Sequence, residues 1–305
     1  MGMIMGRSMV IATEAGRPAP STRPNGPMGA HGALRIRAER LAGRTRLVEE
    51  EHRPPLQVMR AMYLDGAAPD LASITISSAA GGVLQGDRLV TQIAVGPGAR
   101  LRVGTQSATR VYRAPVAEAS VTTTLSVAAS GYLEFLPDPW IPFAGSRVAA
   151  STRCVADPDG TLVLSETVTA GRLARGEVFA MGRFESLLEV ERPDGELVAR
   201  DCVRLDGDGE PRHIGRFGGA LALATLIVVH RGLGPGLLRD ALEHPTSGGV
   251  VAGVVVGASE LPGGAGAWLR VLGPDARSVE GVIGAAVAAV RMATVGSALS
   301  VDRRP

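Results

Sequence analysis

Apolar and polar residues alternate along most of the chain from about residue 33 onward. Around Leu34, apolar side chains at every second position are separated by arginine and glutamate, and segments 99–103, 121–127 and 184–190 follow the same pattern. A period of two places one face of a β-strand on a core and the other in water, which is typical of antiparallel sheet. The pattern therefore predicts a mainly β protein built from many short strands.

Turn sequences rich in Gly, Pro and Asp separate these segments. They lie at 96–98, 157–160, 193–195 and 206–209. Those that carry Asp-Gly or Pro-Asp-Gly between strands are expected to form hairpin loops. No sequence repeat recurs at a fixed period, so the sequence alone does not indicate a regular solenoid.

The last third of the chain follows a different pattern. Segments 220–229 and 250–256 are apolar and predict two buried strands. Segment 235–243 has helical spacing, and a second helix is expected after Asp275 as its cap, through Glu280 to about Met292. No linker is marked, so we expect one β-rich domain over 31–305, after a disordered tail over 1–30 that is rich in Pro, Gly, Ser and Met.

Composition excludes several classes of protein. Hydrophobic residues make up 45% and aromatic residues 3%, so the core is expected to consist of Ala, Val, Leu and Ile, and wholesale disorder is excluded. All 32 positive charges are arginine, which excludes catalysis by lysine. The net charge of +2 gives no argument for nucleic acid. No signal-peptide pattern or membrane-spanning run is present, so we expect a cytoplasmic protein without a membrane partner.

Cysteine and histidine give no metal-binding pattern. Cys154 and Cys202 lie far apart in a sequence without CxxC, which argues against structural zinc, and a disulfide between them is left open. The five histidines lack the spacing of metal ligands, and no GxSxG motif occurs. The residue pattern therefore gives little support to catalysis.

Four segments concentrate the residue types that carry chemistry: GGVLQGDRL at 81–89, GTQSATRVYR at 104–113, LEFLPDPWIPFAG at 133–145 and GRLARGE at 171–177. In the first segment, Asp87 either bonds the backbone of a tight glycine turn or is a buried carboxylate beside Arg88 that binds a cation. The second is either a hydrogen-bonded sheet edge or a recognition surface, since Tyr112 and Arg113 are residue types that anchor interfaces.

The third and fourth segments add two more acidic residues. Glu134 lies among apolar neighbours, where a carboxylate needs a partner or a functional role. The third segment also holds Trp140 in a chain that has few aromatic residues. The fourth places Arg172 and Glu177 beside glycines, for which an internal salt bridge is the simpler interpretation.

In this order and spacing, the four segments resemble the motifs of the UreD family of urease accessory proteins, called UreH in some bacteria. The family pattern contains GG-x-x-x-GD, a TTQ-A-[AS]-TKVYR-like segment, LE-[FW]-LP followed by IPFAGA, and GR-x-A-x-GE. This chain departs from it at Gly104, where Thr is usual, and at Arg110, which replaces Lys. A role that depends on a lysine amine is therefore not carried over to Arg110.

The resemblance implies a fold and a function. The implied fold is an extended helical stack of short β-strands with a few α-helices toward the C-terminus. The implied function is that of a non-enzymatic scaffold that binds the urease apoprotein on one side and a UreF-like protein on the other, with a UreG-like GTPase joining through UreF. Nickel released on GTP hydrolysis would then pass through an internal tunnel to the urease active site. The resemblance implies no tightly bound cofactor, only transient Ni²⁺.

A conduit should bind its ion weakly and at several points, which carboxylates, carbonyls and water provide better than a His/Cys cage. We expect Asp87, Glu134 and Glu177 to line or orient the passage. Their expected ion-pair partners are Arg88, Arg110, Arg113 and Arg175. The other motif or partner candidates are Gly82, Gly86, Thr105, Gln106, Tyr112, Trp140 and Arg172.

Two other classes stay open from sequence alone. One is a β-rich hydrolase or lyase in which Asp87 acts with Glu134 or Glu177 as a general acid–base pair. The other is a plain β-sandwich that serves as a binding module.

Overall fold

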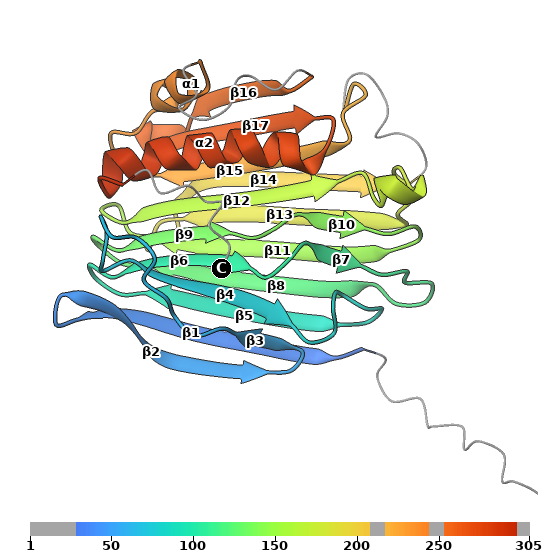
Figure 1. Ribbon diagram of the computed structural model, residues 1–305, viewed down its shortest axis with the longest axis horizontal. Helices are drawn as coiled ribbons and strands as arrows, with labels where there is room; N and C mark the ends of the chain where they lie inside the picture. The colour runs from blue at the N-terminus through green and yellow to red at the C-terminus, as the bar shows by residue number, and fades with distance from the viewer. Residues whose placement is uncertain (1–28, 208–216, 244–252, 298–305) are drawn as a thin grey trace, which may run out of the picture.

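Two β-sheets packed face to face make up the computed structural model, which describes residues 29–207, 217–243 and 253–297 (Figure 1). Sheet A has seven strands, in the order β14 (Leu197–Asp206), β13 (Arg183–Glu191), β11 (Arg147–Ala156), β8 (Ala119–Val127), β5 (Arg88–Val95), β1 (His31–Leu41) and β2 (Arg44–Arg53). Sheet B has ten. Eight follow the order β16 (Val255–Glu260), β17 (Gly266–Gly273), β15 (Ala222–Val229), β12 (Thr161–Thr169), β9 (Tyr132–Leu136), β6 (Arg100–Thr105), β4 (Ala72–Ser78) and β3 (Leu56–Val58). The other two, β10 (Trp140–Pro142) and β7 (Thr109–Val111), pair with each other, and β10 also pairs with β12. The mainly β fold is confirmed.

The chain passes repeatedly from one sheet to the other, as from β5 to β6 and from β8 to β9. The strands in the middle of each sheet therefore run in the same direction as their neighbours: β1, β5, β8, β11 and β13 are parallel in sheet A, and β4, β6, β9 and β12 in sheet B. The expectation of antiparallel sheet is wrong for these strands, whose stacking resembles a solenoid. Their alternation arises because each sheet turns one face to a shared core.

The predicted turns divide accordingly. Segment 193–195 joins the antiparallel strands β13 and β14, which confirms a hairpin. Segment 157–160 instead leads from β11 in sheet A to β12 in sheet B, so the expected hairpin is wrong there. Segment 206–209 lies partly outside the described residues.

Helices α1 (Pro235–Glu243) and α2 (Ala276–Thr294) confirm both predicted helices. The Asp275 side chain accepts a hydrogen bond from the Ser278 N–H at 2.8 Å and caps α2. The two helices contact each other, and α2 covers the outer face of sheet B across β12, β15 and β17 (Figure 1). Two short 3₁₀ turns, Leu173–Arg175 and Pro262–Gly264, lie in loops.

The two apolar runs of the last third have different outcomes. Strand β15 is fully buried, as predicted. The buried strand expected over 250–256 is wrong, because β16 begins at Val255 and forms the edge of sheet B. Val255 is 67% exposed. Residues 250–252 lie outside the described part.

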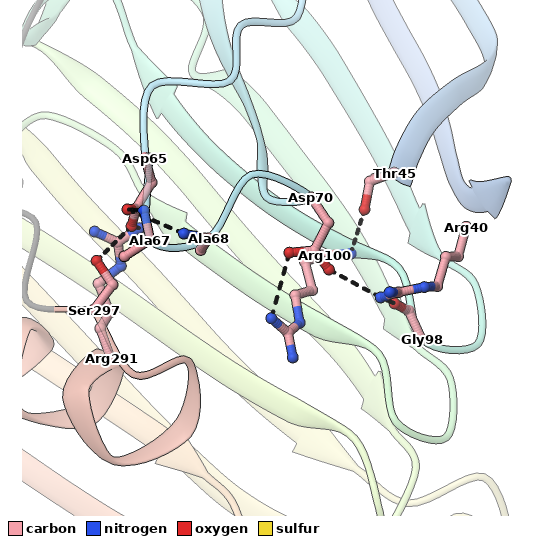
Figure 2. A network of polar contacts seen from close by, with 10 residues as sticks. All are labelled: Arg40, Thr45, Asp65, Ala67, Ala68, Asp70, Gly98, Arg100, Arg291 and Ser297. Carbon is pink, nitrogen blue, oxygen red and sulfur yellow. Dashed lines mark hydrogen bonds and ion pairs between the residues drawn. The ribbon is translucent and has the colours of Figure 1, made fainter. Parts of the chain in front are cut away.

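The loop between β3 and β4 connects the two sheets and α2 (Figure 2). The Asp70 carboxylate accepts a hydrogen bond from Arg40 on β1 at 2.9 Å and forms an ion pair with Arg100 on β6 at 3.5 Å. The Asp65 carboxylate, in the same loop, accepts a hydrogen bond from the Ser297 hydroxyl just after α2 at 2.6 Å. One loop thus ties both sheets to the C-terminal helix.

Cys154 and Cys202 are both free, so they form no disulfide. Burial raises the pKa of the Cys154 thiol to about 12. No helix in the described part of the chain is long and apolar enough to cross a bilayer. Nearly all of the predicted tail, residues 1–28, lies outside the described residues, and the domain boundary stays a prediction.

Candidate functional site

The four sequence segments meet at one end of the sandwich, in the loops 79–87, 104–118, 137–146 and 170–182, which we call the motif end. Backbone hydrogen bonds join the first loop to the second through Val83 and Arg110 at 2.8 Å. The second is joined to the third through Val111 and Phe143 at 2.9 Å, and Gly145 joins the third to the fourth. Residues far apart in the chain therefore form one surface.

Two glycines of the first loop are required by backbone geometry. A Cβ at Gly82 would lie 2.5 Å from the Arg110 carbonyl oxygen and 2.7 Å from the Tyr112 ring, closer than real side chains approach. Gly86 has a φ of +74°, in the left-handed region that favours glycine. The first and second loops can pack this closely only because glycine has no side chain.

Asp87 holds this turn together. One carboxylate oxygen accepts a hydrogen bond from the Ala30 N–H at 2.7 Å, and the other accepts one from the Leu84 N–H at 2.8 Å. The residue is 1% exposed. Both oxygens are thus engaged by backbone, which agrees with the structural interpretation of the glycine turn.

Glu177 joins the fourth loop to the third. The Arg172 guanidinium donates to both of its oxygens, through Nε at 2.9 Å and through a second contact from Nη2, and the Ala144 N–H donates at 3.0 Å. The hydrogen bond from Arg172 lowers the pKa of Glu177. Arg172 also lies over the Phe143 ring, 4.0 Å from its centroid, and Phe143 packs edge-on against Tyr112. The internal salt bridge expected in GRLARGE therefore assembles the motif end.

Glu134 lies elsewhere, on the face of β9 that turns away from the other sheet and toward α2. It is 0% exposed and lies 2.7 Å from the Nε of Arg291 on α2. The Tyr132 hydroxyl donates to it at 2.5 Å, and Arg102 Nε lies 3.7 Å away. Burial, reinforced by the Glu134 charge, raises the pKa of Tyr132 well above its usual value. With Asp65, which lies 3.7 Å from Arg291, these groups form a buried polar cluster that we call the helix clasp.

The three acidic candidates thus have separate partners. Among the described residues, no ion pair joins them to Arg88, Arg110 or Arg113, and Arg175 acts on Glu177 only through its charge, which helps to lower the pKa of that carboxyl. The carboxylates instead bind backbone N–H groups or other arginines that lie closer in the fold. Of the four predicted arginine partners, Arg110 instead donates to the Gly81 carbonyl oxygen at 3.4 Å.

A cavity of about 150 Å³ extends from the motif end into the space between the sheets. Its wall runs from the exposed residues Gly81, Gln106 and Ser107 to the buried Glu166. Four predicted site residues line it, namely Gly82, Thr105, Gln106 and Trp140, whereas Asp87, Glu134 and Glu177 do not.

Most of the wall of this cavity is apolar, but hydroxyl groups form a row along one side. Thr91, Thr123 and Thr152 occupy paired positions on β5, β8 and β11 and form a row of hydroxyl side chains along sheet A. Near the mouth, Thr105 and Asp138 bind each other: the Thr105 hydroxyl donates to the carboxylate at 3.0 Å and accepts from the Asp138 N–H at 2.8 Å. The wall therefore offers weak oxygen ligands in succession.

Glu166 is the carboxylate at the inner end, and it is not among the site residues predicted from the sequence. It is 8% exposed and accepts a hydrogen bond from the Ser186 hydroxyl of sheet A at 2.7 Å. Burial raises its pKa to about 7; the Ser186 hydrogen bond opposes this shift and the Asp201 charge adds to it. The sequence did contain a pattern that indicates its position. Glu166 follows Leu162 and Leu164 at every second residue of β12, so its side chain lies on the same face of the strand as theirs, which is the face that packs in the core.

Asp138 is also absent from the predicted site residues, although it lies within the third segment, 133–145. Among the described residues, no three His, Cys, Asp or Glu side chains gather as a metal-binding cluster. The arrangement can contact a cation through single carboxylates and hydroxyls, each of which binds weakly.

Comparison with known proteins agrees with the resemblance in the motifs. The family model described as UreD urease accessory protein matches residues 30–304. A protein named urease accessory protein UreD 2 from Streptomyces griseus is 37% identical over 266 residues, which cover 86% of this chain and 90% of the relative. Similar relatives are UreD 2 of Brucella suis, 32% identical over 92% of this chain and 93% of its own length, and UreD of Haloarcula marismortui, 35% identical over 86% of each. The chain belongs to the UreD family of urease accessory proteins.

Proposed function

We propose that this protein is a maturation scaffold and metallochaperone subunit for urease, and not itself a catalyst. Together with a UreF-like protein and, through it, a UreG-like GTPase, it binds the urease apoprotein and helps to deliver Ni²⁺ to the active site. Membership of a family named for urease accessory proteins supports the role in urease maturation. The proposal places the protein in the cytoplasm, with protein partners and neither a nucleic-acid nor a membrane partner.

The cavity between the sheets is the observation that carries the nickel-delivery part of this proposal. It begins among exposed motif residues and ends at Glu166, with hydroxyl groups along one wall. Carboxylates and hydroxyls bind divalent cations through oxygen, and a succession of single ligands lets an ion move on. Ni²⁺ is therefore cargo of this cavity and not a resident cofactor.

This proposal transfers the passage role from the acidic residues expected from sequence to Glu166 and Asp138. Asp87 and Glu177 hold the loops that form the motif end, and Glu134 holds α2. Their part in the function is to shape the protein around the cavity.

No observation favours the hydrolase or lyase alternative. A general acid–base pair needs two groups that reach the same substrate. Asp87, Glu134 and Glu177 do not line the cavity, and each is engaged by its own separate partners.

The test is co-expression with apo-urease and the UreF-like and UreG-like proteins, followed by pull-down and measurement of nickel in the purified urease. The full chain is expected to co-purify with both urease and the UreF-like protein. Failure to co-purify with either one would overturn the scaffold role.

The nickel route is tested by Glu166→Gln, which should still co-purify but lower the nickel loaded into urease severalfold. The matched control is Glu185→Gln, because Glu185 lies on β13 beside Ser186 but on the opposite face of the strand. Equal nickel loading in both variants would refute passage past Glu166 while leaving the scaffold role intact.

A further inference from the structure

Sheet B extends past the last strand of sheet A. Asp201 on β14, which ends sheet A, binds Thr225 on β15 and Arg270 on β17, so β14 faces these two strands. Sheet B ends with β17 and β16, and both lie above β14 in Figure 1. Within the described residues, sheet A therefore has no strand to face β16, which is open on the side that elsewhere packs in the core.

This open side of β16 carries small and apolar residues. Val255 is 67% exposed and pairs with Leu272 on β17, which packs against the core between the sheets, so both side chains lie on the face that points toward sheet A. Gly257 and Ser259 follow on the same face of β16 and are exposed, and Trp268, which pairs with Ser259, is half-buried. We call these five residues the overhang.

The edge of β14 beside the overhang is open as well. In the described part of the chain β14 pairs only with β13, although it is 10 residues long. A strand edge presents a row of unpaired N–H and C=O groups to which another strand can add, and proteins often block such an edge with a charged side chain that points inward. Asp201 points inward here, but Arg270 and Thr225 already bind its carboxylate, so this charge does not block the edge.

A cavity of about 460 Å³ lies at one end of this edge. Its wall includes Leu197 and Val198 at the start of β14, and Pro262 and Gly263 of the 3₁₀ turn between β16 and β17. Charged residues of both signs complete the wall, so the cavity by itself does not select the charge of a ligand. It leaves room for an added strand to begin between β14 and the end of the overhang.

The charges along β14 indicate which kind of strand fits. Arg200 and Arg204 point to the outer face of sheet A, where their side chains are 61% and 53% exposed. On β13, Glu189 lies 3.3 Å from Arg200, and Glu185 pairs in register with Arg204. Opposite charges at paired positions stabilise a sheet, whereas like charges destabilise it. A new neighbour with acidic residues at its outward positions would repeat the pairing that β13 already makes.

A second copy of β14 supplies this acidic charge poorly. Its one outward-facing acidic residue, Asp206, is already engaged by Arg183 at 3.1 Å and by Arg204 at 3.0 Å. The other charged residues on its outward face are Arg200 and Arg204. Charge therefore favours a strand from a different protein.

We propose that β14 and the overhang form a docking site for one extended, acidic segment of a partner protein. The segment adds to the seven strands of sheet A beside β14, its apolar side chains cover Val255, Leu272 and Trp268, and its acidic side chains pair with Arg200 and Arg204. Main-chain hydrogen bonds supply the affinity, and the alternating side chains supply the specificity. The inference goes beyond the proposed function, which does not say where any partner binds.

The test is the binding of a synthetic ten-residue peptide, equal in length to β14, to the purified full-length chain. The peptide alternates valine with glutamate and carries a fluorescent label, so that its anisotropy reports binding. A second peptide has lysine at each glutamate position. The wild type is expected to bind the glutamate peptide at least about tenfold more tightly than the lysine peptide, because two cross-strand charge pairs change from attraction to repulsion.

Two pairs of variants locate the site. Arg200→Glu/Arg204→Glu should reverse the preference between the peptides, whereas Arg153→Glu should leave it unchanged, because Arg153 lies on the same outer face but on β11, away from the open edge. Val255→Gln should weaken the binding of the glutamate peptide severalfold, since it places an amide against the valines. Val256→Gln, on the opposite face of β16, should not.

Three results would overturn the inference. The first is no difference between the peptides in the wild type, including no binding of either, and the second is a preference that survives the double charge reversal. The third is self-association of the full chain that this reversal abolishes, because it would assign the edge to a second copy. If circular dichroism shows that the double variant is unfolded, Arg200→Gln/Arg204→Gln replaces it and should abolish the preference. Each of these results leaves the proposed function standing, because that function is measured by co-purification and by nickel in urease.

Discussion

Replacing Arg291 by methionine should destabilise the protein severely, because this side chain holds α2 on sheet B through the helix clasp. The Arg291 and Glu134 side chains are 4% and 0% exposed, and Arg291 Nε lies 2.7 Å from the Glu134 carboxylate. Methionine fills most of the space of the arginine stem but leaves the carboxylate buried without its nearest cation.

The magnitude follows from what remains around Glu134. Tyr132 still donates to the carboxylate, but Arg102 lies 3.7 Å away and is itself partly exposed. Breaking a buried ion pair by removing one partner costs about 3–5 kcal/mol, a large share of the stability of an ordinary domain. Asp65 is less affected, because Ser297 and two backbone N–H groups still bind it (Figure 2).

The assay is urea unfolding followed by circular dichroism. Glu134→Gln/Arg291→Met should recover a large part of the lost free energy of unfolding, because no buried charge is then left on β9. The control is Arg277→Met, an exposed arginine on the same helix, which should change stability by less than about 0.5 kcal/mol. A loss for Arg291→Met no larger than that of the control would refute the reasoning, as would a double variant no more stable than Arg291→Met.

Three further predictions concern the cavity and the motif end. Glu166→Gln should gain stability relative to the wild type as the pH rises from about 5 to about 8. The Glu166 carboxyl has a pKa of about 7 in the folded protein against a usual 4.5, so in this window the folded wild type holds a proton that the unfolded chain has lost. The free energy of unfolding of the wild type therefore falls by about 3 kcal/mol across this window, whereas that of the glutamine variant does not. Parallel profiles of unfolding free energy against pH would contradict this. Gly82→Ala should cost about 1–3 kcal/mol in thermal unfolding, because its Cβ would overlap the Arg110 carbonyl, and an unchanged melting temperature would argue against the close packing. Glu177→Gln should cost only about 1 kcal/mol, since its pair with Arg172 is partly exposed, yet it should speed proteolysis within loop 170–182, and an unchanged cleavage rate would show that the pair does not hold the loop.

Periodicity predicted the strands but not their direction. The alternation around Leu34 and at 121–127 marks the buried face of β1 and β8 in the structure. It looked like antiparallel sheet, but the same pattern occurs in any strand with one face on a core. Direction depends on which strands become neighbours, and here consecutive strands belong to different sheets.

The motifs predicted where chemistry gathers but not which carboxylate faces the cavity. Asp87, Glu134 and Glu177 stand out in sequence because they lie in dense motifs, yet backbone N–H groups and arginines engage all three. Glu166 stands in a run of Thr, Ser, Leu and Val without any motif, and only its parity with Leu162 and Leu164 pointed inward.

By itself, the sequence determined the mainly β character of this protein, its two late helices and its family. Each of these depends on local periodicity, capping residues or short motifs, which are properties of neighbours in the chain. Only the tertiary structure decided that the four segments share one end of a sandwich, that a cavity runs inward from them, and that Arg270 lies beside Asp201. Those facts depend on register between strands separated by tens of residues, and register is set by the packing of two whole sheets rather than by any local pattern.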